Sequence, residues 1–223
     1  MLAQDAVGFE RYLDEAADQV LKHADAEKLL APGAQTRIGA GLDRHGALRE
    51  VIAAQMCGRW RNGVPYKTSP DTPFPDPAVS RTNFDYTAHS RCPVGAHMKR
   101  ANPHDGPIVQ RIANYARRVV RRGMSYGPDF DPAHPGDAER GLLGNFIGEN
   151  LGAHFETVMC DWLNLGLQDP AVMGSNNLLL AANSPKRSWF DLRTQDGSSS
   201  SIRGFPRFVN TRCGAYTSLP SIT

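Results

Sequence analysis

The chain lacks the motifs of several large enzyme classes. It has no GxSxG, GxxxxGK(S/T) or GxGxxG pattern, which disfavours the α/β-hydrolase, P-loop and dinucleotide-binding folds. It has no HExxH, and its cysteines are too scattered to form a CxxC pair, so the sequence predicts no zinc site. Those cysteines are Cys57, Cys92, Cys160 and Cys213.

Long apolar runs are also missing. No stretch approaches the ~18 consecutive apolar residues that mark a membrane-spanning helix, so no span is expected. The first residues, MLAQDAVGFERYLDEAAD, include early acidic side chains and no apolar run, and we expect neither a signal peptide nor a membrane anchor. Scattered cysteines behind such a start are typical of free thiols in the reducing cytoplasm, where we expect the protein to be located.

Charge of one sign is not in excess. The 25 basic and 23 acidic residues give a net charge of +2, and aromatic residues make up 8% of the chain. Nucleic-acid-binding domains concentrate positive charge and interleave it with aromatic rings, so no nucleic-acid partner is expected. The 223 residues are enough for one sizeable domain without disulfide bonds.

Apolar periodicity predicts three main helices. Residues 7–30, 43–57 and 151–165 each carry apolar side chains on one helical face. Residues 62–91 contain several prolines, which exclude a long helix or a central strand there. Residues 105–118 are expected to be irregular to helical.

The remaining apolar segments predict strands. Residues 119–126 enter a strand with a turn at Arg122-Gly123, and residues 141–148 are expected to form a buried strand. Two final strands are predicted around residues 208–209 and 215–216. Because strands do not alternate regularly with helices, the pattern favours an α+β fold over a parallel α/β fold.

The sharpest local pattern surrounds His97, in the run CPVGAHMKRANP that starts at Cys92. Gly95 and Ala96 are small and leave room for a flat cofactor near the backbone. A neutral imidazole is then available as an axial iron ligand. By spacing alone, a histidine among small residues is more often structural, so both interpretations stay open at this point.

A basic run, RRVVRRGMSYGP, starts at Arg117. It is typical of a solvated surface, of a site for a phosphate or a heme propionate, or of a buried arginine that stabilises charge on a peroxide. Nearby acidic residues are Asp161 and Asp169, and either could accept the second N–H of an iron-bound histidine. For Asp169, a turn-forming Asp-Pro is the competing interpretation.

Taken in chain order, these pieces resemble the C-terminal, heme-binding domain of the dye-decolourising peroxidases. The resemblance extends from about residue 48 to residue 221 and depends on the order, spacing and number of the matches. The matching stretches are GRWRNGVP (58–65), NFDY (83–86), RCP to Pro103 (91–103), RRGMSYGP (121–128), ERGLL (139–143), Phe155-Glu156, Trp162 with Asn164, Asp169-Pro170, FPRFV (205–209), GAY (214–216) and LPS (219–221).

The resemblance implies a fold and a cofactor. The expected fold is a ferredoxin-like α+β domain of the dimeric α+β barrel superfamily. It would span residues 43–223 and follow an N-terminal helical extension, residues 1–42. The implied cofactor is heme b, held between a sheet and helices.

The resemblance also implies roles for single residues. His97 matches the iron ligand of the family, and Arg121 matches its catalytic distal arginine. Arg122 is expected beside Arg121 at the cofactor. Asp169 is expected to be the carboxylate behind the histidine, with Asp161 in reserve.

The sequence departs from the family in ways that bear on activity. It contains no GxxDG motif, whose aspartate assists peroxide deprotonation and cleavage in the family, and only some fifty residues precede the first match. Residues 144–149, GNFIGE, replace a bulkier and more apolar strand. Ser125 stands where proline is common, and His104 where arginine is common. The residues that could replace the missing aspartate are Asp85, His89, Asp129 and Glu149.

Three explanations of the missing motif compete. Another polypeptide supplies the other half, a homo-oligomer rebuilds it from two copies, or the chain binds heme for another purpose. We expect a heme-b oxidoreductase that uses hydrogen peroxide to oxidise small organic compounds such as dyes and phenols, with atypical or partner-dependent activity. The alternative is a non-catalytic heme-binding or assembly subunit.

Overall fold

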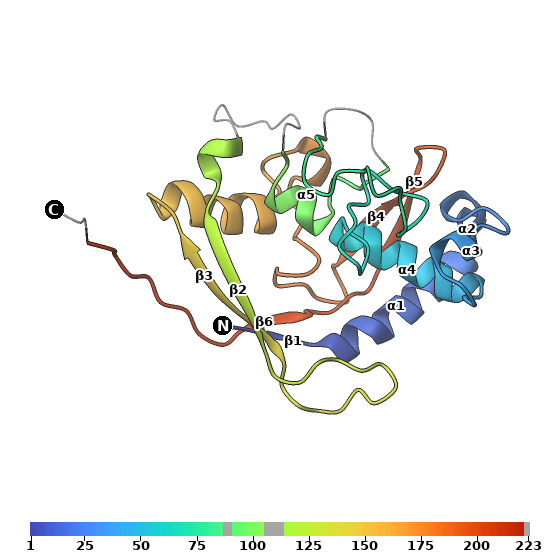
Figure 1. Cartoon of the computed structure of the whole chain (residues 1–223), viewed down its shortest axis with the longest axis horizontal. Helices are drawn as coiled ribbons and strands as arrows, with labels where there is room; N and C mark the ends of the chain where they lie inside the picture. Colours follow the sequence, from blue (N-terminus) through green and yellow to red (C-terminus); the bar gives the residue numbers. More distant parts are fainter. Residues whose placement is uncertain (87–90, 105–113, 221–223) are drawn as a thin grey trace.

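The computed structural model describes residues 1–86, 91–104 and 114–220 and has an α+β fold (Figure 1). Within these residues, a four-stranded antiparallel sheet has the order β2-β3-β1-β6, and a two-stranded antiparallel sheet pairs β4 with β5. The α+β class predicted from the sequence is confirmed. The strands are β1 (Leu2–Gln4), β2 (Val120–Tyr126), β3 (Gly141–Ile147), β4 (Trp189–Arg193), β5 (Ser199–Arg203) and β6 (Val209–Thr211).

The N-terminal part of the chain is mostly helical, and local capping sets its helix ends. The carboxylates of Asp5 and Asp43 each accept a 2.7 Å hydrogen bond from the backbone N–H three residues later, at Gly8 and Gly46. Gly58 ends a helix in the left-handed conformation, with φ at 89°. The helices are α1 (Ala6–Leu21), α2 (Asp25–Leu29), α3 (Gln35–Ile38) and α4 (Arg44–Cys57).

The structure confirms one predicted helix here and divides another. Residues 43–57 form α4 as predicted, with Asp43 as its N-cap. The helix predicted over residues 7–30 is divided into α1 and α2, because the backbone N–H of His23 bonds to the carbonyl of Val20 in a tighter turn. The turn lets α2 pack against both α1 and α4.

One hydrophobic core joins the four N-terminal helices to β4, β5 and the chain leading into β6. Tyr12 of α1 meets Phe205 edge to face, with ring centroids 5.7 Å apart. Residues 1–42, which are predicted to form a helical extension outside the domain, contribute to this same core. They also supply β1, which lies between β3 and β6.

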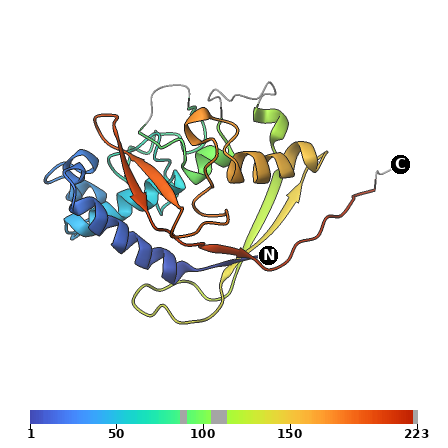
Figure 2. The same cartoon turned by 180° about the vertical axis from the view of Figure 1, so that it is seen from behind.

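The helices of the second half lie over the four-stranded sheet (Figure 2). The helix predicted over residues 151–165 is present as a π-helix, in which bonds such as Leu165 N–H to Cys160 O, at 3.0 Å, span five residues. No helix in the described parts of the chain is long and apolar enough to cross a membrane. These helices are α5 (His97–Ala101), η1 (Asn114–Arg117), η2 (Gly152–Asn164, the π-helix) and η3 (Pro170–Val172).

The strands differ from the sequence predictions in three respects. β2 runs without a break through Arg122-Gly123, where a turn is predicted, because β3 places Gly144 directly opposite Gly123. β3 is largely exposed rather than buried, and Leu143 is 45% exposed. Of the two predicted final strands only β6 forms. Residues 212–220 contain no strand and run away from the body of the molecule in both views (Figures 1 and 2).

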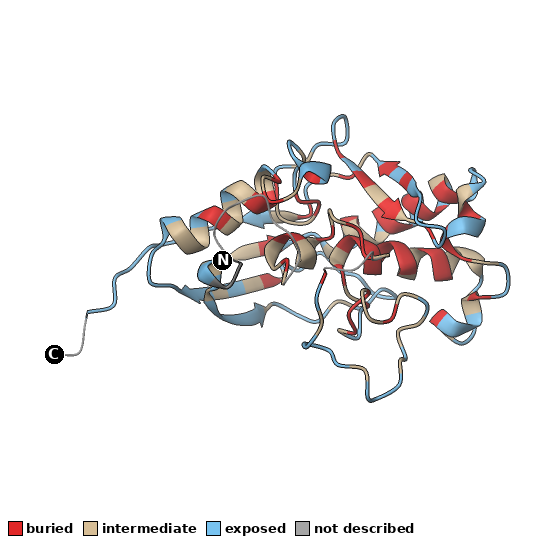
Figure 3. Cartoon of the chain, turned by 90° about the horizontal axis from the view of Figure 1, so that it is seen from above, coloured by how far each residue is buried: buried red, intermediate tan, exposed pale blue. Residues whose placement is uncertain are grey.

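The β2–β3 hairpin is the least covered part of the fold. In the described ranges, the main core takes no residue from β2, β3 or η2, and buried residues gather instead around α1 and α4 (Figure 3). Val120, Met124 and Ile147 are 70%, 56% and 48% exposed. Clustered apolar side chains at a surface mark a binding site or an interface.

Candidate functional site

The short helix α5 begins at His97 and packs against α4. Gly58, which follows α4, lies so close to α5 that a Cβ on Gly58 would be 3.2 Å from the Cβ of Met98 and 3.5 Å from that of Ala96. Gly95 is similarly close to the ring of Phe190. The small residues around His97 therefore serve close packing of α5 against α4 and β4.

Arg100 ties α5 to the end of the π-helix. Its buried guanidinium donates to the carbonyl oxygens of Trp162 and Leu163, at 2.8–3.1 Å, and to the backbone and side-chain oxygens of Ser175. Carbonyls at a helix end have no partner within the helix, and a cation satisfies them well. Burial lowers the pKa of Arg100 to about 10, so it remains charged at neutral pH.

Asn177 fixes one nitrogen of the His97 ring. The Nδ1 of His97 lies 3.1 Å from the Oδ1 of Asn177. The same oxygen accepts 3.0 Å bonds from the backbone N–H groups of Leu179 and Leu180. The two backbone N–H groups identify this atom as the amide oxygen, which has no hydrogen to donate. The donor in its bond with His97 is therefore Nδ1, which carries the proton. Nε2 is then the unprotonated nitrogen, able to bind a metal.

The surroundings of His97 keep it neutral. Burial lowers its pKa below the ordinary value, the bond to Asn177 raises it, and the positive charges of Arg121 and Arg100 lower it further. A neutral imidazole is the form that ligates a metal. Across the described residues, no group of three His, Cys, Asp or Glu side chains converges to hold a metal ion.

The face of the β2–β3 hairpin that carries Arg121 lies toward η2. Phe146, directly opposite Arg121, packs on Phe155 of η2 with ring centroids 5.2 Å apart. Two residues along, Gly123 pairs with Gly144, so no side chain rises from the backbone in the Gly123–Gly144 strip. The ring of Phe146 leans over Gly144, 2.7 Å from where a Cβ would be, and Leu142 lies 3.5 Å from where a Cβ of Gly123 would be.

Arg122 lies on the other face of the hairpin. Successive side chains in a strand point to opposite sides, so Arg122 shares a face with Val120 and Met124. The structure therefore does not bring both arginines to His97. The charge of Arg121 acts on His97, while Arg122 faces away.

The two aspartates predicted behind the histidine lie elsewhere. Asp169 caps η3, where its carboxylate accepts a 2.9 Å bond from the N–H of Ala171. In the described part of the chain, Asp161 makes no hydrogen bond to the His97 ring. Asn177 occupies the position assigned to them. No sequence motif marks it, and the only local signal is an Asn before an apolar run, which is typical of a turn.

The residues proposed to replace the missing distal aspartate are spread over the fold. β2 ends at Tyr126, which lies five residues, or roughly 16 Å, along the strand from Arg121. Asp129 comes after that end. Figure 1 shows that loop on the opposite side of the molecule from α5. Asp85 lies in the proline-rich excursion, and His89 lies outside the described residues. Glu149 follows β3 at the end that carries Arg121.

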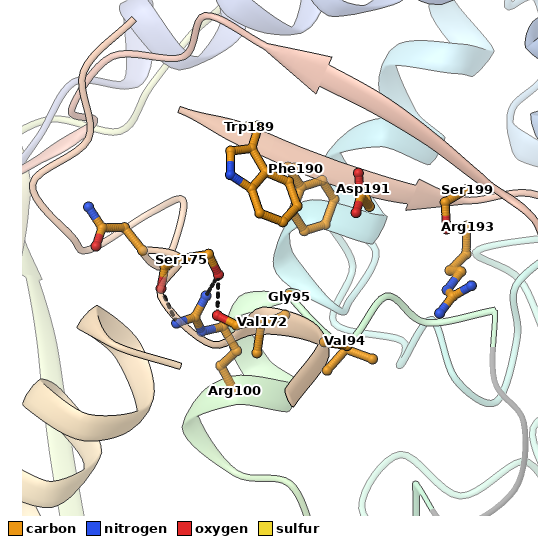
Figure 4. A pocket seen from close by; sticks show the side chains of 12 residues that line it. Val94, Gly95, Arg100, Val172, Ser175, Trp189, Phe190, Asp191, Arg193 and Ser199 are labelled. Carbon is orange, nitrogen blue, oxygen red and sulfur yellow. Dashed lines mark hydrogen bonds between the residues drawn. The ribbon is translucent and has the colours of Figure 1, made fainter. Parts of the chain in front are cut away.

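A small cavity lies between α5 and β4 (Figure 4). It is lined by Gly95, Arg100 and Trp189 among others, and its volume is about 50 Å³, room for a few water molecules. Within the described residues, His97 is not part of its wall. The cavity is far too small for a heme.

Comparison with curated proteins finds fungal peroxidases. The chain is 28% identical over 206 residues to Peroxidase 2 of Mycetinis scorodonius, covering 78% of this chain and 39% of that protein. It is 25% identical over 202 residues to the dye-decolorizing peroxidase AauDyP1 of Auricularia auricula-judae, with 79% and 39% covered. No family model matches the sequence. The chain spans about two fifths of the length of these relatives.

Solved structures of the same kind share the fold. A dye-decolorizing peroxidase in complex with 2,6-dimethoxyphenol superposes with a TM-score of 0.63 at 22% identity, covering 94% of this chain and 45% of that one. The Auricularia auricula-judae enzyme gives 0.63 at 21% identity, with 96% and 48% covered. A third, engineered in its heme pocket for asymmetric sulfoxidation, gives 0.57.

These structures confirm the predicted ferredoxin-like α+β architecture. Sequence and fold together relate this chain to the dye-decolourising peroxidases, to somewhat less than half of whose length it corresponds.

Proposed function

We propose that this chain is a heme-b oxidoreductase subunit that uses hydrogen peroxide to oxidise small organic compounds such as phenols and dyes. The observation that carries the proposal is the fixed tautomer of His97. Asn177 holds Nδ1, which leaves Nε2 unprotonated, and the positive charge of Arg121 lies near enough to lower the pKa of His97. A phenol is also the compound bound to one of the related enzymes.

The residues present fit a heme. In the described chain, the hydrogen bond at the His97 ring involves Nδ1 alone, which suits an axial ligand whose other nitrogen binds iron. In the Gly123–Gly144 strip no Cβ would stand between the backbone and a planar group, and the Phe146 ring, which leans over Gly144, would contact that group.

The proposed reaction reduces peroxide and oxidises the organic compound. One hydrogen peroxide and two phenol molecules give two water molecules and two phenoxyl radicals, which balances atoms and electrons. Heme supplies the iron that passes electrons one at a time. His97 would anchor the iron through Nε2. Arg121 would stabilise the negative charge that develops as the peroxide O–O bond lengthens.

A partner is part of the proposal. The chain corresponds to less than half of its relatives, and its β2–β3 hairpin exposes apolar side chains. A second copy of the chain, or a separate chain, would cover the outer face of that hairpin and reach around the edge strand β2 to supply the distal acid–base group on the Arg121 face. We propose that this assembly works in the cytoplasm.

The test is an absorption spectrum of protein produced with heme supplied. The Soret band expected of the wild type should be lost in His97→Ala, because the iron would lose its protein ligand. His134→Ala is the matched control, since that imidazole lies 87% exposed in the loop after β2. A Soret band that is absent from the wild type, or unchanged in His97→Ala, would refute the ligand assignment.

A further inference from the structure

The hydrogen bond behind His97 ends on a neutral group. Asn177 is completely buried, and its Oδ1 receives three N–H groups, two of them from the backbone. The two backbone bonds settle which way the amide is turned, because its NH₂ group cannot accept from them. Through this contact, His97 donates to an uncharged amide oxygen rather than to a carboxylate.

The position of Asn177 is determined by its whole surroundings. Its backbone N–H donates to the carbonyl of Leu163 at 2.6 Å, and its carbonyl accepts from Ala181 N–H and from the side chain of Asn183. Its own Nδ2 is buried without a partner in the described structure. A buried donor left unpaired is costly, so the fold retains this amide despite a free-energy penalty.

Asn177 sets how much electron density His97 can give to a metal. A carboxylate behind an imidazole pulls on the Nδ1 proton and makes the ring a stronger donor, which favours ferric over ferrous iron. An amide oxygen pulls less. The Asp169 carboxylate, which the sequence predicts in this place, accepts instead from the N–H of Ala171.

We infer that Asn177 is a positioning residue that locks His97 as the neutral Nδ1–H tautomer and holds the iron at a higher reduction potential than a carboxylate would. This inference rests on the proposed function. It specifies a site tuned toward reduced iron, in which the proximal side assists O–O cleavage weakly. Arg121 and the partner must then supply most of that assistance.

The experiment compares Asn177→Asp with Asn176→Asp in the heme-loaded protein. Asn176 is exposed, so its variant adds the same charge one residue away without touching His97. Asn177→Asp should favour ferric over ferrous binding about tenfold, which lowers the reduction potential by about 59 mV. It should also raise the iron–histidine stretching frequency of the ferrous protein. Asn176→Asp should change neither by a comparable amount.

Two outcomes separate this inference from the proposed function. Equal potentials and stretching frequencies in the two variants, with a Soret band that depends on His97, would overturn the role of Asn177 alone. A Soret band that survives His97→Ala would overturn both proposals. A measurement that needs no variant is the ¹⁵N spectrum of His97 in the purified protein. It should show a protonated Nδ1, and a protonated Nε2 would refute the inference.

Discussion

Arg121 and Arg122 are neighbours in sequence but lie on opposite faces of one strand, which makes them a natural pair for an experiment. The charge of Arg121 acts on His97, whereas Arg122 shares its face with exposed Val120 and Met124. Arg121→Ala should lower the rate of peroxide-dependent oxidation of 2,6-dimethoxyphenol by about 10²–10³-fold, since it removes one fixed positive charge from the reacting oxygens. Initial rates at saturating peroxide measure this.

Arg122→Ala is the control and should retain the wild-type rate, with an unchanged Soret band in both variants. Equal losses in the two variants would mean that the run acts as a general basic surface. A wild type that binds heme through His97 but does not turn over would favour the alternative function, a non-catalytic heme-binding subunit.

Single residues stand out in the sequence where a motif surrounds them. His97 and Arg121 are recognisable because each lies in a run of matching neighbours, in the right order. Asn177 has no such run. Chemical reasoning favours a carboxylate as the partner of His97 Nδ1, so the sequence predicts Asp169 in that position. The competing interpretation of Asp169, a turn-forming Asp-Pro, describes what its side chain does. The bond from His97 to Asn177 joins residues 80 positions apart, and no local pattern encodes it.

At the scale of elements, the Gly123–Gly144 pair leaves a strip of the hairpin without Cβ atoms. Neither glycine is needed for a left-handed backbone, and a Cβ on Gly123 would meet Leu142 at an ordinary 3.5 Å. Because glycine weakens a strand interior by roughly 0.5–1 kcal/mol, Gly123→Val should leave the free energy of unfolding unchanged or slightly higher. It should weaken heme retention about tenfold by filling the strip. Urea unfolding and the rate of heme transfer to an apoglobin measure the two effects.

Met124→Val provides the comparison on the opposite face. It adds a β-branched residue to the same strand and should leave heme retention as in the wild type. If Gly123→Val holds heme as tightly as Met124→Val, the strip is not the surface on which the cofactor lies.

A helix or strand could be predicted where the residues that determine it lie within it or next to it. α4 carries its own N-cap at Asp43 and its own end at Gly58, so the sequence predicts it closely. β1, β4 and β5 were missed. β1 is three residues long, and its partners in β3 and β6 lie more than a hundred residues away. The turn predicted at Arg122-Gly123 is wrong because the pairing of Gly123 depends on β3, about twenty residues away, and not on its neighbours in sequence.

At the scale of the whole molecule, burial is uneven. The main core joins α1–α4 to β4 and β5, where most buried residues lie (Figure 3), while the hairpin that carries Arg121 is attached by pairing of β3 with β1 and by the contact of Phe146 with Phe155 of η2. The main core is formed by side chains of this chain alone. The hairpin has one face toward η2 and the proposed cofactor, and another that solvent alone would cover. That second face is where a partner would bind.

The proposal of a dimer that buries this face can be tested by adding one negative charge to the face. Leu143, 45% exposed, shares the outer face with Val120 and Met124, so Leu143→Glu should raise the dimer dissociation constant at least about tenfold, roughly 1.4 kcal/mol. Leu21→Glu is the matched control, because Leu21 is 39% exposed at the far end of α1. Light scattering of the heme-loaded protein should give the mass of two copies for the wild type and for Leu21→Glu, and of one copy for Leu143→Glu. A wild-type monomer with heme fully bound would exclude the homodimer.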